Sequence, residues 1–192
     1  MTPTPLTPLG LAALALLVER PMHPYEMYQT LIQRSEDRVV KVRPGSLYHT
    51  VDRLAEKGLL RATGTEREGN RPERTTYEIT ERGTLALNER ITTILATPIN
   101  EYPEFPLALG EAHHLPLETV LQLLHNRRVL LCTELDAMDS ELADVRAKNL
   151  PRKYWIDREY TRTLAQVELT WLESLIDDLE SGDLAWSDEK HL

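Results

Sequence analysis

The sequence predicts a mainly α-helical protein in two parts. Residues 1–90 contain three short helical patterns, and two strand-like segments joined by a polar loop follow them. Residues 117–145 carry apolar side chains in alternating steps of four and three, which is the 3.5-residue repeat of packed helices. These patterns predict an N-terminal winged helix-turn-helix with a two-stranded wing, followed by a C-terminal antiparallel helical dimerisation domain.

The length of 192 residues allows two domains, which we place at residues 1–97 and 98–192. The boundary falls where prolines interrupt the helical pattern. The only cysteine, Cys132, excludes an internal disulfide framework and fits a reducing, cytoplasmic compartment. We expect it to be a small buried side chain. The apolar run at residues 9–18 is too short to span a bilayer, so we expect a buried helix there and no membrane partner.

The formal net charge of −9 is unevenly divided. Residues 1–90 hold 13 Lys and Arg against 12 Asp and Glu, whereas residues 91–192 hold 9 against 19. The acidic excess lies in the second half and does not exclude a cationic surface in the first. The acidic half also leaves an alternative open, in which the chain is a protein-interaction adaptor that binds through its helical arms and keeps a vestigial winged helix.

The segment Val42–Leu60 predicts a helix suited to a DNA groove. A Pro-Gly pair breaks the preceding structure, Ser46 can cap the new helix, and apolar residues then recur along one face. The outer face is polar or cationic apart from Asp52 and Glu56. The side chains that we expect to contact DNA from this helix are Ser46, Tyr48, His49, Thr50 and Arg53. Those expected to help on phosphate are Lys41, Arg43 and Lys57. The alternative is the ordinary solvated face of an amphipathic helix.

The strand-like segments 59–63 and 75–79 flank a polar loop that contains glycine. A hairpin directly after such a helix is the wing of a winged helix-turn-helix, and its loop can lie along the backbone or minor groove of a duplex. The loop side chains expected on DNA are Arg67, Arg71 and Arg74. The alternative is a solvated hairpin tip, because three glutamates of the same loop partly neutralise these arginines.

Several blocks of the first ninety residues occur in a familiar order. They are Leu9-Gly10-Leu11, Pro21-Met22-His23-Pro24-Tyr25-Glu26-Met27, Pro44-Gly45-Ser46-Leu47-Tyr48, Arg53-Leu54, Lys57-Gly58-Leu59-Leu60 and Tyr77-Glu78-Ile79-Thr80-Glu81-Arg82-Gly83. Together they resemble the PadR family of bacterial transcriptional regulators. The resemblance implies a homodimeric, usually repressing protein whose third helix enters the major groove. It also implies that Tyr25 and Tyr48 meet the sugar-phosphate backbone; the alternative for both is half-buried aromatic packing.

In the apolar repeat at residues 117–145, Arg128 is the only residue that is not apolar. Pro151 closes this long helix, and a last helix runs to about Gly182. Because one hairpin leaves apolar faces that a partner would cover, we expect a homodimer that reads a pseudo-palindromic operator in double-stranded DNA. The side chains expected at the dimer interface are Leu121, Leu124, Leu131, Leu135, Met138, Leu142, Leu164, Leu172, Leu175 and Leu179.

Aromatic side chains near and within the last helix could line a pocket for a flat aromatic effector. They are Tyr154, Trp155, Tyr160 and Trp171. The family resemblance, which includes regulators that sense phenolic acids or drugs, supports such an effector. The alternative is that these rings fill the core of the dimer.

Neither a metal nor an organic cofactor is expected. The residues His113, His114, Glu118 and His125 are close in sequence, but adjacent histidines on a proline-bounded turn should diverge. The sequence contains no Gly-rich phosphate loop, nucleophile elbow or paired acid and base. We therefore expect a DNA-binding regulator and no enzyme. An enzymatic activity in the second half would need a set of catalytic residues that matches no known motif.

Overall fold

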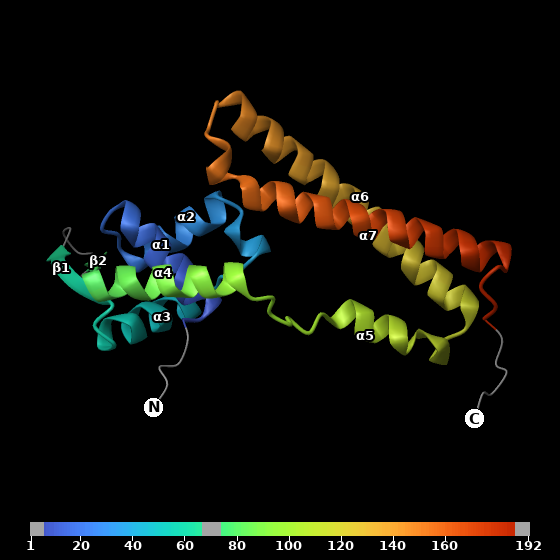
Figure 1. Cartoon of the computed structure of the whole chain (residues 1–192), viewed down its shortest axis with the longest axis horizontal. Helices are drawn as coiled ribbons and strands as arrows, with labels where there is room; N and C mark the ends of the chain where they lie inside the picture. Colours follow the sequence, from blue (N-terminus) through green and yellow to red (C-terminus); the bar gives the residue numbers. More distant parts are fainter. Residues whose placement is uncertain (1–5, 67–73, 187–192) are drawn as a thin grey trace. The chain divides into compact units, whose positions relative to one another are not determined.

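The computed structural model of the chain describes residues 6–66 and 74–186. The chain forms two compact units, Met1–Glu101 and Tyr102–Leu192 (Figure 1). Each unit contains its own hydrophobic core. The division lies inside the proline-interrupted segment. The predicted fold class is confirmed, because the described residues are mostly helical with a single two-stranded antiparallel sheet. Within the described ranges, no helix is long and apolar enough to cross a bilayer.

Three helices build the core of the N-terminal unit: α1 (Pro8–Glu19), α2 (Pro24–Gln33) and α3 (Pro44–Glu56). Each begins with proline, whose missing N–H would have no partner in a first turn. The side chains of Thr7 and His23 cap α1 and α2 by accepting backbone N–H groups at 3.1 and 3.0 Å. The three predicted helices therefore begin where the sequence places its Pro signals.

Apolar side chains from all three helices meet in this core. Leu14, Leu31, Leu47 and Val51 are each completely buried. Burial of apolar surface stabilises a fold by about 25 cal/mol per Å², so these contacts dominate over any exposed ion pair. Because Leu47, Val51 and Leu54 form the apolar face of α3, the opposite, polar face points away from the core.

The wing is an antiparallel hairpin of β1 (Leu60–Glu66) and β2 (Arg74–Ile79), with an irregularity in the register of β1. The backbone of Tyr77 in β2 also pairs with the backbone of Met22, in the loop between α1 and α2. Both N–H···O distances of this pair are 3.0 Å. The wing is therefore joined by main-chain hydrogen bonds to the helical core.

Helix α4 (Glu81–Ala96) begins against the residues that lead into β1. The hydroxyl oxygen of Thr80 caps it by accepting the N–H of Gly83 at 3.1 Å, and donates to the carbonyl of Gly58 at 2.9 Å. A Cβ atom on Gly83 would lie 2.2 Å from the carbonyl oxygen of Leu59. Only glycine fits this approach of α4 to the wing.

The C-terminal unit is a long helical hairpin preceded by a short helix. Its α-helices are α5 (Glu104–Gly110), α6 (Leu117–Ala147) and α7 (Ile156–Ser181). The single-turn 3₁₀ helices of the described chain are η1 (Glu36–Arg38), η2 (Ala112–His114) and η3 (Arg152–Tyr154). Helix α7 is capped by Gly182, whose φ of +80° is the left-handed conformation that glycine adopts freely.

The hairpin of α6 and α7 buries its own apolar seam. Residues of α6 with a relative exposure of 8% or less in the single chain are Val120, Leu124, Leu131, Leu135, Met138, Leu142 and Val145. On α7 the matching residues are Leu169, Leu172, Ile176 and Leu179. Leu121 and Leu175 pack partly buried against the same cluster. Within the single chain α7 covers this seam and supplies the second helix that a 3.5-residue repeat requires, and the role of these residues in a dimer stays a prediction.

Two other side chains of these helices differ from the sequence-based expectation. Cys132 is exposed, because it lies one residue, and therefore about 100° around the helix, beyond the buried Leu131. Leu164 is 51% exposed and faces away from α6. Helix α7 therefore has a second apolar stripe, distinct from the one that contacts α6.

We predict that Gly83→Ala destabilises the N-terminal unit by about 1–3 kcal/mol, because the added methyl group must displace the Leu59 carbonyl. Chemical denaturation followed by far-ultraviolet circular dichroism measures the change. The matched control is Gly45→Ala, since a Cβ there meets no atom within 4 Å. Equal stability of the two variants would contradict the proposed close approach.

Candidate nucleic-acid interface

The outer face of α3 carries the side chains that the sequence predicts for DNA contact. Tyr48, His49 and Arg53 are exposed, and Thr50 is half-buried. Its hydroxyl donates to the carbonyl of Ser46 at 2.7 Å, so its oxygen remains free to accept. This arrangement presents donors, acceptors and a cation on one side of a short helix, as base edges and phosphates require.

The start of α3 differs from the expectation in one detail. Arg43 occupies the N-cap position and makes no side-chain capping hydrogen bond, whereas the expected cap, Ser46, lies within the first turn. The reason is Pro44, which is favoured as the first helical residue and moves the start of the helix ahead of the serine. The exposed Ser46 hydroxyl is therefore not used in capping.

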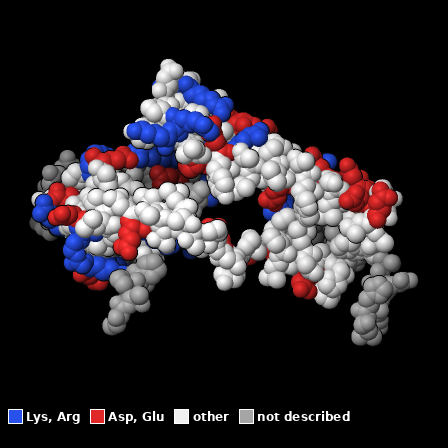
Figure 2. Space-filling view, viewed as in Figure 1, with Lys and Arg blue, Asp and Glu red and all other residues white. Residues whose placement is uncertain are grey.

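The cations around α3 are unpaired, unlike other arginines of the same unit. In the described chain, no carboxylate forms an ion pair with the four exposed cations Lys41, Arg43, Arg53 and Lys57. By contrast, the arginines paired with glutamate are Arg20 with Glu26, Arg34 with Glu19, and Arg61 with Glu78. Figure 2 shows Lys and Arg side chains over the region of α3. Positive charge without an internal partner is available to phosphate.

His23 links the start of α2 to the side chain of Tyr48 on α3. Tyr25 and Tyr48, predicted to contact the DNA backbone, are 47% and 39% exposed. His23 accepts the backbone N–H of Tyr25 and packs its ring edge-on against that of Tyr48, with centroids 6.0 Å apart. His23 was missed as a positioning residue, although the His-Pro pair before a helix was the available signal.

The helix that follows the wing adds one cation that the sequence analysis missed. Arg82, in the first turn of α4, is exposed and lies beside Gly58 at the end of α3. Of the predicted wing arginines, Arg67 and Arg71 lie outside the described residues. Arg74 begins β2, and its side chain is likewise outside the described part. Their contribution to DNA binding stays a prediction.

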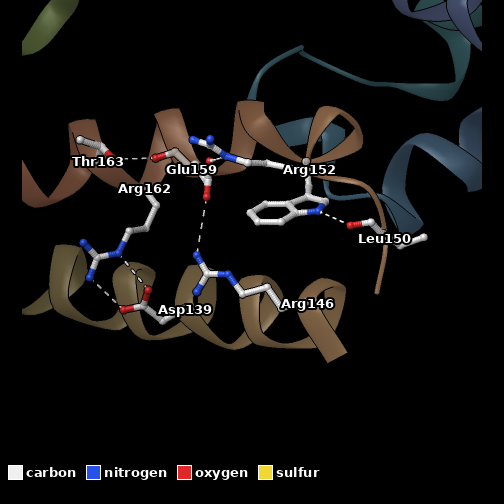
Figure 3. A network of polar contacts seen from close by, with 8 residues as sticks. Asp139, Arg146, Leu150, Arg152, Glu159, Arg162 and Thr163 are labelled. Atoms are coloured by element: carbon white, nitrogen blue, oxygen red, sulfur yellow. Dashed lines mark hydrogen bonds and ion pairs between the residues drawn. The ribbon is translucent and has the colours of Figure 1, made fainter. Parts of the chain in front are cut away.

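The C-terminal unit contains a pocket of about 660 Å³ at the end of the hairpin where η3 joins α7. Arg162 donates to both carboxylate oxygens of Asp139, at 2.9 and 3.0 Å, and this lowers the pKa of Asp139 (Figure 3). Glu159 accepts from Arg152 at 2.7 Å and lies 3.7 Å from Arg146. Three arginines thus face two carboxylates, and the lining has an excess of positive charge.

The four aromatic residues predicted for an effector do not assemble into one pocket in this chain. Tyr160 lines the pocket described above. Trp155 is a buried core residue whose indole N–H donates to the carbonyl of Leu150 at 2.9 Å. Tyr154 and Trp171 are 66% and 48% exposed and are absent from its lining. The spacing of these aromatic residues along the sequence does not show which side chains near the start of α7 point into the hairpin and which point to solvent.

The adjacent histidines of η2 do not diverge, contrary to the expectation. The ring centroids of His113 and His114 lie only 4.1 Å apart, and Glu111 joins them in a cluster of three possible metal ligands. A 3₁₀ turn is tighter than an α-helix and brings nearby side chains together. His125 lies elsewhere, 2.9 Å from Glu180, and Glu118 is not part of the cluster.

The three-helix core, the wing and the free cations of α3 define a DNA-binding winged helix-turn-helix protein of the transcriptional-regulator class. Residues 13–89 match the family model described as "Transcriptional regulator PadR-like family". Residues 13–89 therefore form a PadR-like regulator domain, and the resemblance found in the sequence is confirmed for this part of the chain. The sequence matches no curated protein.

Solved structures share the fold over nearly the whole chain. Bacillus subtilis PadR in complex with operator DNA matches with a TM-score of 0.78 and 18% identity, covering 92% of this chain and 99% of that chain. The same protein in complex with p-coumaric acid matches with a TM-score of 0.73 and 16% identity, covering 90% and 98%. The PadR-like regulator BC1756 from Bacillus cereus matches with a TM-score of 0.64 and 14% identity, again covering 90% and 98%.

We predict that Arg53→Ala weakens DNA binding for all sequences and reduces the slope of log affinity against log salt by about one unit. The unpaired guanidinium on the outer face of α3 would otherwise neutralise a phosphate. Fluorescence anisotropy at several salt concentrations measures both quantities. Lys148→Ala, an exposed cation of the C-terminal unit, is the control. An unchanged slope in the Arg53 variant would show that this residue only faces solvent.

Proposed function

We propose that the chain is a homodimeric, sequence-specific transcriptional repressor that a small aromatic acid releases from its operator. The observation that supports DNA recognition is the row of unpaired cations and hydrogen-bonding side chains on and beside α3. A second copy related by a two-fold axis would present the same helix to the second half of a pseudo-palindromic operator.

An exposed apolar stripe on the hairpin supports the homodimer. On α7, Leu164, Val167 and Trp171 follow one another in steps of three and four and are 51%, 61% and 48% exposed. On α6, Leu123 and Leu130 are 53% and 70% exposed. Large apolar side chains at helical spacing without a covering element are typical of an interface. The seam already buried inside the hairpin would then hold the two helices in place for a partner.

The ion pairs between α6 and α7 show that these residues share one side of the hairpin. Arg127 and Glu168 pair at 2.5 Å on the side where both helices turn their exposed apolar residues. The pairs of His125 with Glu180 and of Arg162 with Asp139 lie on the other side. The exposed apolar residues therefore gather on one side of the hairpin, which also carries the ion pair of Arg127 with Glu168. A self-complementary apolar side fits a second copy of the same chain, because a two-fold axis brings identical patches together.

We predict that Val167→Asp converts the dimer to monomers, because a charge at the centre of the stripe would be buried without a partner. Sedimentation velocity at micromolar concentration measures the state of assembly. Thr170→Asp places the same charge on the same helix but off the stripe, and it should remain dimeric. A monomeric wild-type chain, or a dimeric Val167→Asp variant, contradicts the proposed interface.

The arginine-rich pocket supports an anionic effector. Arg146 and Arg152 share only the carboxylate of Glu159, so an added carboxylate can pair with either guanidinium. The ring of Tyr160 in the same lining offers a surface for an aromatic group. Such a site fits a small aromatic acid of the kind named in the complex of Bacillus subtilis PadR with p-coumaric acid. Figure 2 shows further Lys and Arg side chains gathered at the connection between α6 and α7.

A gel shift with the DNA upstream of the chain's own gene tests the regulator. We expect a shift at physiological salt that random DNA cannot compete, because specific complexes are typically about a thousandfold or more tighter than non-specific ones. A reporter placed behind the same DNA should be silenced by the chain. No shift would favour the adaptor that binds a protein partner through its acidic arms.

The same gel shift, repeated with p-coumaric acid, tests the effector. Release of the DNA by the acid, and loss of that release in Arg152→Ala, are the expected results. If the acid has no effect on the wild-type complex, the arginine-rich pocket does not bind this acid as an effector. That outcome would not affect the conclusion on DNA binding, which rests on the gel shift without the acid.

A further inference from the structure

The turn between α5 and α6 gathers two imidazoles and one carboxylate, and we propose that it binds a divalent transition-metal ion of the zinc, nickel and copper class. Glu111, His113 and His114 each offer one ligand atom, and these atoms all lie within 4.8 Å of one another. Three such groups around one point are sufficient for a site in which water completes the coordination shell. The proposal is independent of DNA binding.

The hydrogen bond of His113 prepares its ring for a metal. Its Nδ1 atom lies 3.1 Å from the carbonyl oxygen of Gly110. A carbonyl oxygen can only accept, so Nδ1 carries the proton and Nε2 keeps its lone pair. Histidines that ligate metals commonly donate their other ring N–H to a carbonyl or carboxylate in this way, which fixes the tautomer and the ring orientation.

The 3₁₀ geometry of η2 aligns the other two ligands. Residues three apart eclipse one another in such a helix, and this places His114 over Glu111. The Nε2 atom of His114 lies 3.4 Å from Oε2 of Glu111. Both side chains are largely exposed, so an ion can enter from solvent and the carboxylate and imidazole need no rearrangement of the core.

The ligand types select the class of ion. Imidazole nitrogen suits zinc, nickel and copper, whereas calcium and magnesium prefer shells made of oxygen. A bound ion would bridge the end of the α5 segment and the start of α6. The carbonyl of Leu115, next to His114, already accepts the indole N–H of Trp186 at 2.9 Å. The turn is thus held on one side, and Trp186 lies close enough to report on an ion there.

Titration of the untagged full chain with Zn²⁺ by isothermal calorimetry tests the site. We expect one ion per chain with micromolar affinity, because the three ligand groups already lie together. The double variant His113→Ala/His114→Ala should lose this binding. His125→Ala, which removes a histidine paired with Glu180 elsewhere on α6, should keep it.

Cu²⁺, which quenches nearby indole fluorescence, gives a second readout. It should quench wild-type emission, and Trp186→Phe should remove most of the quenching while leaving Zn²⁺ binding intact. The exposed positions of the two histidines allow the double variant to fold, as circular dichroism can verify. Absence of Zn²⁺ uptake by the wild-type chain, or equal uptake by the double variant, overturns the proposal.

Discussion

Burial of one face of α3 is the constraint on which the N-terminal unit depends. Leu47 and Val51 are completely enclosed by the surrounding helices, which leaves the helix no freedom to rotate about its axis. Since successive faces of a helix are fixed relative to one another, anchoring the apolar side also aims Tyr48, His49 and Arg53 outward. Recognition chemistry here is thus positioned by hydrophobic packing, and no polar contact of the outer face needs to support it.

Apolar packing also determines the structure of the C-terminal unit. Its hairpin satisfies the long apolar repeat internally, and only then presents a second stripe that includes Val167 and Trp171. The opposite side of the hairpin carries cross-helix ion pairs. A hairpin of this kind holds its two helices together with one set of apolar residues and leaves another set for the proposed partner, so the two sets can vary independently.

Sequence patterns were sufficient for the fold and for placing the side chains predicted to contact DNA on the exposed face of α3. Helix α3 and the two strands formed where local sequence signals predicted them. These signals are Pro44, the periodic Leu47 and Val51, and the strand-like residues around Leu60 and Tyr77. The failures were all questions of direction in space. A heptad repeat cannot say whether its second helix comes from the same chain, and adjacency in sequence did not reveal that His113 and His114 would face one another. Those outcomes depend on tertiary packing that no short pattern encodes.

The joint between Met22 and Tyr77 is made by peptide groups alone, with two N–H···O bonds of 3.0 Å. A coupling of this type is indifferent to the chemistry of the side chains on either strand, provided that they fit. Surface side chains of the wing and of the loop before α2 can therefore be substituted while the backbone hydrogen bonds between them are kept. This tolerance gives a physical reason why chains sharing only 14–18% of their residues with this one retain the same architecture.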